Sequence, residues 1–116
     1  MTEQELINVC LELENAQADY PFGDGWAVLR HKDNRKWFAC VFDRDGVCIN
    51  LKCNPFESDM LRQSFKSIMP AYHMNKEHWI MVKTGGDVSS ELLRGLIKNS
   101  FELTKRKKNT NGKYEC

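Results

Sequence analysis

The sequence lacks a large net charge and a long hydrophobic run. Lys and Arg number 17 and Asp and Glu 16, which gives a formal charge of +1, so binding to nucleic acid or to a membrane surface cannot rest on bulk electrostatics. No apolar stretch approaches the ~20 residues that span a bilayer. Residues 1–19 contain no Lys or Arg, whereas a signal peptide starts with basic residues. We therefore expect a cytoplasmic protein without a membrane segment.

The cysteines follow no known pattern, and motifs for catalysis are missing. The 5 cysteines are an odd number and form no Cys-x-x-Cys pair, so neither a disulfide framework nor a structural zinc site is expected. The sequence also has no phosphate-binding loop, no Ser-His-Asp pattern and no paired-carboxylate motif. It therefore predicts no catalytic residue, no metal and no cofactor, and it favours a protein that is not an enzyme.

Cys53 leaves one enzymatic alternative open. It lies just before a predicted helix N-terminus, a position that can lower the pKa of a thiol. It also alternates with Ile49 and Leu51 along a predicted strand. That alternation favours a small apolar side chain in the core over a nucleophile.

The remaining pattern begins with a helix. The 116 residues leave room for one domain at roughly 150 residues per domain. Thr2 and Glu5 have the spacing of a capping box, and apolar residues recur at helical spacing as far as Ala16. The sequence therefore predicts a first helix that ends just before Tyr20, where proline and glycine follow.

After Tyr20 the pattern becomes that of an antiparallel sheet. A second helix is expected to begin at the Asn54 N-cap and end near Lys66, with a loop over 67–77, and a last helix to run from the Ser89 N-cap to Thr104. The predicted order, helix-strand-strand-strand-helix-strand-helix, is typical of an α+β fold. Strands are predicted over residues 26–31, 36–43, 47–53 and 78–83.

Several segments resemble the MmcQ/YjbR family of small bacterial proteins. They are Tyr-Pro-Phe-Gly at 20–23, Asn-Leu-Lys-Cys-Asn-Pro at 50–55, Tyr-His-Met-Asn-Lys-Glu-His-Trp at 72–79, and the last helix at 91–103. The resemblance extends from about Glu3 to Thr104. It implies a fold related to frataxin and to double-wing DNA-binding domains, with helices on one face of an antiparallel sheet. It also implies a proposed role in binding DNA, without an established biochemical activity. Residues 1–104 are thus expected to form one domain, and the basic, polar segment 105–116 a flexible tail.

Basic residues gather at the predicted turns of the sheet. In a DNA-binding interpretation these turns act as wings against phosphates, and the binding is weak, salt-sensitive and without sequence preference. In the alternative interpretation they are solvated ends of strands, as suits a chain of charge +1. The expected phosphate contacts are Lys32, Arg35, Lys36, Arg44 and Lys76.

The segment from Tyr72 to Trp79 supports a second hypothesis. Loops on a rigid scaffold often carry function, so the chain is alternatively a non-enzymatic module that binds a small ligand or a protein in a concave pocket at this loop. A structural interpretation is equally open, in which the aromatic side chains fill the core and the histidines satisfy backbone groups. The candidate residues are Tyr72, His73, Met74, Asn75, His78 and Trp79. In either case we expect a monomer.

Overall fold

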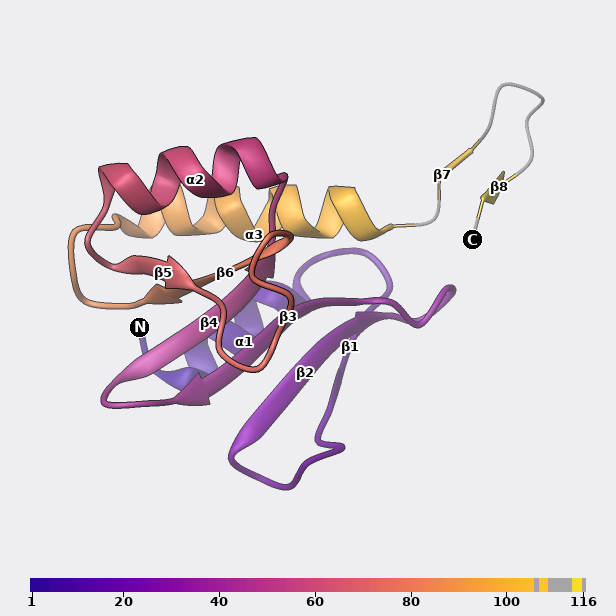
Figure 1. Cartoon of the computed structure of the whole chain (residues 1–116). Coiled ribbons are helices and arrows are strands. Elements are labelled where there is room, and N and C mark those ends of the chain that lie inside the picture. The colour runs from indigo at the N-terminus through magenta and orange to yellow at the C-terminus, as the bar shows by residue number, and fades with distance from the viewer. Residues whose placement is uncertain (106, 109–113, 116) are drawn as a thin grey trace.

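An antiparallel sheet forms the frame of the molecule, and helices attach to it (Figure 1). The computed structural model describes residues 1–105, 107–108 and 114–115, in which the main sheet has the strand order β1-β2-β3-β4-β6-β5. This confirms the predicted α+β class with an antiparallel sheet. The strands are β1 (Ala16–Asp19), β2 (Trp26–His31), β3 (Trp37–Asp43), β4 (Val47–Lys52), β5 (Ile68–Pro70) and β6 (Trp79–Lys83), and the helices are α1 (Glu3–Leu11), α2 (Pro55–Ser64) and α3 (Ser90–Thr104).

The C-terminal segment contributes a separate pair of strands. β7 (Lys107–Lys108) and β8 (Tyr114–Glu115) are antiparallel to each other. The other residues of the tail predicted over 105–116, apart from Lys105, lie outside the described residues. The flexibility expected of this tail therefore stays a prediction.

The helices begin where their capping residues predict. The Thr2 hydroxyl accepts a hydrogen bond from the Glu5 amide at 3.1 Å, and the Glu5 carboxylate accepts one from the Thr2 amide at 3.3 Å. The Asn54 side chain caps α2, with proline in the first turn, and the Ser89 hydroxyl caps α3. Each cap satisfies an amide that has no partner within its helix.

The predicted end of the first helix is wrong, and one predicted loop contains a strand. α1 ends at Leu11, and Ala16–Asp19 form β1, which pairs with β2 at the sheet edge. The chain turns at Asn15, whose φ of 58° lies in the left-handed region, a conformation that Asn tolerates better than most residues. Within the loop predicted over 67–77, β5 pairs with β6 and places Pro70 on an edge strand, where no ladder donor is needed.

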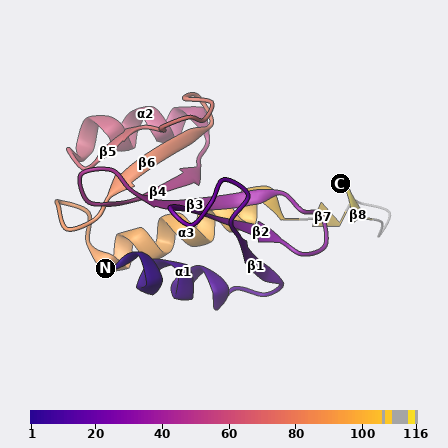
Figure 2. The same ribbon diagram turned by 90° about the horizontal axis from the view of Figure 1, so that it is seen from below.

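The two faces of the sheet are covered differently. α1 and α3 lie together on one side of the central strands (Figure 2), and the main core lies between sheet and helices. Leu61 of α2 and Phe65, which directly follows α2, also pack against this core. Over the other face, the loop between β5 and β6 crosses in front of β3 and β4 (Figure 1). We call this second side the open face. Its buried residues are Val28, Cys40, Phe42, Cys48 and Met81, with Trp26, Trp37, Met69 and Tyr72 packed on them.

A β-bulge in β3 determines which face Trp37 occupies. Leu29 pairs with Ala39 but the next residue, Arg30, pairs with Trp37, so Phe38 is an extra residue without an opposite partner. Phe38 and Ala39 therefore both belong to the main core, whereas Trp37 packs on the open face. A bulge commonly re-aims a neighbouring side chain in this way.

The hydroxyl of Ser100 in α3 satisfies the backbone at this bulge. It donates a hydrogen bond to the Phe38 carbonyl at 2.5 Å and accepts one from the Lys52 amide at 2.8 Å. Ser100 is fully buried. One side chain thus ties α3 to β3 and β4, at a point where the ladder leaves a donor and an acceptor without backbone partners.

Replacing Ser100 by alanine is expected to lower the free energy of unfolding by about 1–3 kcal/mol, because a buried amide and a buried carbonyl lose their partner. The measurement is urea unfolding of S100A and of S90A, which removes an exposed hydroxyl from the same helix. S90A should resemble the wild type. Equal stability of all three proteins would show that the bulge does not need the hydroxyl.

Candidate functional site

An apolar cleft opens on the open face of the sheet. It encloses about 370 Å³, within the range of ~300–1,000 Å³ that is typical of small-molecule sites. Its walls are almost entirely apolar. The lining residues are Phe22, Trp26, Trp37, His73 and Met74.

Three rings from two strands and a loop build the wall of this cleft. Trp26 begins β2 and Trp37 begins β3, so they sit toward opposite ends of two neighbouring antiparallel strands. Phe22, from the β1–β2 loop, lies between them. Its ring centroid is 6.4 Å from that of Trp26 and 5.9 Å from that of Trp37, and both pairs meet edge to face.

Two of these three rings, Trp26 and Phe22, differ in how firmly the protein holds them. Trp26 stacks on Phe42 with 4.1 Å between centroids and 7° between planes, so it is a fixed wall. Phe22 is 67% exposed, which leaves much of its ring without a protein partner. The cleft thus combines a rigid floor with a ring that another molecule can cover.

The loop between β5 and β6 supplies the other side of the cleft. His73 has a φ of 62°, a left-handed conformation that is uncommon outside glycine. The centroid of its ring lies 3.8 Å from the ring centroid of Tyr72 and 6.2 Å from that of Trp26. The Arg44 guanidinium stands over the outer part of this group, 3.8 Å from the Tyr72 ring centroid, as a cation–π contact.

Polar side chains hold this loop in shape. The side-chain oxygen of Asn75 (Oδ1) accepts hydrogen bonds from the backbone amides of Glu77 and His78 at 2.9 and 3.2 Å. The Lys76 ammonium donates to the Ala71 carbonyl at 2.7 Å. Buried Asn50 donates its side-chain N–H to the Tyr72 carbonyl at 2.9 Å. The loop is therefore pre-organised rather than loose.

The candidate loop residues consequently divide into two groups. His73 and Met74 line the cleft and Tyr72 packs beside them, whereas Asn75 shapes the backbone. His78 is exposed, and its carbonyl accepts from the Cys53 amide. Trp79 lies in β6 opposite Lys52 and does not line the cleft.

The five basic candidates do not form one patch. Lys32, Arg35 and Lys36 are exposed at the β2–β3 turn, and Arg44 lies at the β3–β4 turn at the other end of these strands (Figure 1). Arg44 is engaged with Tyr72 and Lys76 with the loop backbone. The three residues of the β2–β3 turn form no ion pair within the described part of the chain.

Sequence reasoning missed Phe22, Trp26 and Trp37 as site residues. Phe22 lies in the Tyr-Pro-Phe-Gly segment that carried part of the family resemblance. Both tryptophans lie in predicted strands with apolar residues on both faces. That pattern indicates a sheet that is covered on both faces. It was the signal in the sequence from which aromatic residues on the face without helices could have been inferred.

The structure gives no support to Cys53 as a nucleophile. Its side chain is buried in the main core, as its alternation predicts. Burial raises the pKa of its thiol, and the nearby Glu57 carboxylate raises it further, which is opposite to activation. Among the described residues no three His, Cys, Asp or Glu side chains form a group that could hold a metal ion, and no helix is long and apolar enough to cross a membrane.

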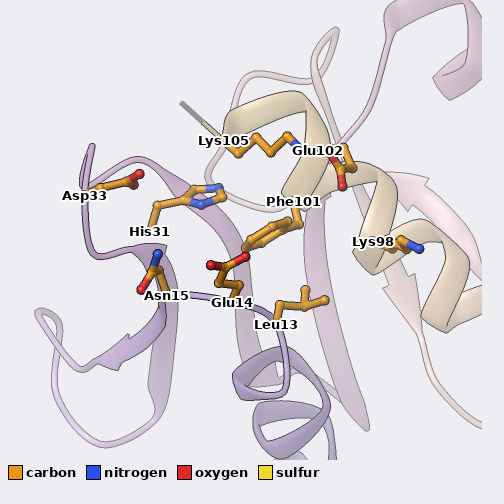
Figure 3. A pocket seen from close by; sticks show the side chains of 9 residues that line it. All are labelled: Leu13, Glu14, Asn15, His31, Asp33, Lys98, Phe101, Glu102 and Lys105. Atoms are coloured by element: carbon orange, nitrogen blue, oxygen red, sulfur yellow. Dashed lines mark ion pairs between the residues drawn. The ribbon is translucent and has the colours of Figure 1, made fainter. Parts of the chain in front are cut away.

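A larger hollow of about 520 Å³ lies at another end of the molecule, between the end of α3 and the β2–β3 turn (Figure 3). Its walls are mostly polar and carry both signs of charge, and Lys105 pairs with Glu102 at 2.5 Å. Solvated and paired charges gain little from a ligand, because their desolvation must be offset. The exposed rings of the smaller cleft gain from being covered, so we place the candidate site there.

His31 is buried beneath this hollow. The Thr104 hydroxyl donates to the Ser100 carbonyl at 2.8 Å, so it accepts a hydrogen bond from His31 Nε2–H, also at 2.8 Å. The imidazole packs on Phe101, with 4.4 Å between ring centroids. Burial lowers the pKa of His31, against the opposing effect of Asp33, so the neutral ring is the folded form.

The chain is thus a small α+β protein whose sheet carries helices on one face and aromatic side chains on the other. The chain belongs to the YjbR family, whose model matches residues 11–103. It is similar to the uncharacterized protein YyaQ of Bacillus subtilis, with 34% identity over 90% of this chain and 99% of the relative. It is also similar to the uncharacterized protein YbdF of Escherichia coli O157:H7, with 42% identity over 82% of this chain and 77% of the relative.

Solved structures share the fold. A crystal structure of a Pseudomonas syringae protein has a TM-score of 0.80 and 35% identity, and the match covers 90% of this chain and all of the other. A Deinococcus radiodurans protein gives a TM-score of 0.83 and 33% identity, over 97% of this chain and 84% of the other.

The buried neutral His31 predicts a loss of stability in acid. The unfolded chain binds a proton near pH 6.5 and the folded protein only at lower pH, so the free energy of unfolding falls as the pH drops below about 6.5. Urea unfolding at pH 7.5 and 5.5 should show a smaller fall for H31Q than for the wild type. H78Q, which changes an exposed histidine, should keep the wild-type fall. Equal falls in H31Q and the wild type would contradict this role of His31.

Proposed function

We propose that the protein is a non-enzymatic binding module that takes a flat aromatic group into the cleft of the open face. The observation that carries this proposal is the set of aromatic rings at an opening of about 370 Å³, one of them 67% exposed. Exposed apolar surface that forms a concavity marks a binding site more often than scattered single residues do.

The shape of the cleft favours a flat ring over an aliphatic chain. Aromatic pairs gain ~0.5–1.5 kcal/mol beyond area burial when they meet edge to face or offset-stacked. Phe22 meets both tryptophans edge to face, so an incoming ring can continue the same packing. His73 is the one titratable side chain among the lining residues, which supports binding rather than catalysis.

Weak binding to nucleic acid without sequence preference is the second candidate, and the β2–β3 turn favours it. Lys32, Arg35 and Lys36 are all exposed there. Such groups can contact phosphates without reading bases. Because Arg44 lies at the other end of the strands, we do not propose that the two turns enter a groove together as a pair of wings.

Binding of indole, which is flat and uncharged, tests the first proposal. In a backbone amide NMR titration, we expect shifts around Phe22, Trp26, Trp37 and residues 72–74, with an affinity that salt does not change. F22A should weaken binding about tenfold, which corresponds to the ~1.4 kcal/mol of one lost ring contact. F56A removes a 74% exposed ring from α2 and should bind like the wild type. Equal losses in F22A and F56A, or shifts confined to the surroundings of His31, would contradict the proposal.

A further inference from the structure

We propose that the aromatic group is a nucleobase, and that the ligand is a single strand of nucleic acid laid along the open face between the β2–β3 turn and Arg44. This inference rests on the proposed function, because it needs the cleft to accept a flat ring. It goes further by naming the ligand and by assigning roles to residues outside the cleft.

A continuous row of rings crosses the open face. Tyr72 contacts His73, His73 lies 6.2 Å from Trp26, and Phe22 joins Trp26 to Trp37 at 6.4 and 5.9 Å. Proteins that bind single strands use successive aromatic side chains on which bases stack. Several bases can stack along a row of this kind, whereas a single cleft accommodates one base.

Basic residues lie at both ends of this row of rings. Arg44 covers Tyr72 at one end. At the other end Lys36 directly precedes Trp37, and Arg35 and Lys32 belong to the same turn. The strand between them, β3 from Trp37 to Asp43, is about 20 Å long at ~3.4 Å per residue. Phosphates of an extended strand can therefore reach cations at both ends while bases occupy the rings between them.

This arrangement of rings and basic residues suits a single strand better than a duplex. Bases in a duplex are stacked on one another and cannot offer a face to Phe22 or His73. Both side chains are exposed, and burial of their faces requires unstacked bases. The basic turns, at opposite ends of the strands, match the length of a strand that crosses the sheet.

Carboxylates near the row limit the affinity. Asp33 and Asp45 lie in the same turns as the basic residues, and Asp43 is the last residue of β3. Asp24 follows Phe22 closely in the chain. Asp33 and Asp43 accept hydrogen bonds from turn amides, and Asp19 pairs with Arg30 at 2.6 Å. Their charge still opposes phosphate, so binding is expected to be weak and confined to low salt.

Fluorescence anisotropy with labelled ten-nucleotide strands tests the inference. The probes are oligo(dU), oligo(U) and a ten-base-pair DNA duplex, at several salt concentrations. Both single strands should bind at least tenfold more tightly than the duplex. Four phosphate contacts predict a slope of log K against log salt of about −2.8, at ~0.7 per contact for single strands. A preference between oligo(U) and oligo(dU), which differ in the sugar alone, then identifies the sugar that the face accepts.

Two sets of variants separate the rings from the charges. F22A should weaken oligonucleotide binding by about 5–150-fold, which corresponds to ~1–3 kcal/mol for one stacked base, and F56A should not. K32E/R35E/K36E should bring the slope close to −0.7, the value for the one remaining contact. The control variant K66E/R94E/K98E makes the same change of charge elsewhere, at exposed residues just after α2 and within α3. Its slope of log K against log salt should stay close to that of the wild type.

The inference is overturned if the duplex binds as tightly as the single strands, or if both triple variants lose binding equally. It is also overturned if none of the oligonucleotides binds at low salt. In each of these cases, unchanged binding of indole to the cleft would leave the proposed function intact. Failure of both ligands to bind would overturn the two proposals together.

Discussion

The bulge at Phe38, held by the buried hydroxyl of Ser100, is the constraint on which the open face depends. If β3 alternated regularly through Phe38, Trp37 would lie on the core side with Ala39 and Val41. Because of the bulge, Phe38 joins the core and Trp37 joins the open face. The same hydroxyl fixes α3 to β3 and β4. One hydrogen-bonded serine thus couples the position of a helix on one face to the composition of the cleft on the other.

A cleft forms because the two faces of the sheet are covered by different elements. Helices bury one face, and in the described part of the chain the second is covered by the loop between β5 and β6 and by the segment around Phe22. The loop covers β3 and β4 and is held by Asn50, Asn75 and Lys76. It stops beside Trp26. The rings beyond it stay partly open to solvent, where a ligand can complete the packing.

Local chemistry made most of the fold predictable. The caps at Thr2, Asn54 and Ser89 depend on residues within three positions of one another, and the structure confirms all three. The predicted end of α1 was wrong because an alanine such as Ala16 can be buried in a helix or in an edge strand. Pairing with β2, which the local pattern does not contain, decides between the two. The residues of the cleft were missed for the same kind of reason, because they depend on contacts between distant parts of the chain. The bulge that places Trp37 is hydrogen-bonded to Ser100, more than sixty residues further along the chain, and no periodicity within β3 contains that information.

We propose that the bulge-placed Trp37 and the exposed Phe22 form the site at which a flat ring binds. A crystal structure of the protein soaked with indole is the decisive test. Electron density for the ring is expected against Phe22 and Trp37, with the Phe38 bulge and its hydrogen bond to Ser100 unchanged. Density only in the polar hollow beside His31, or a Phe22 ring that closes the cleft and leaves no ligand, would contradict it.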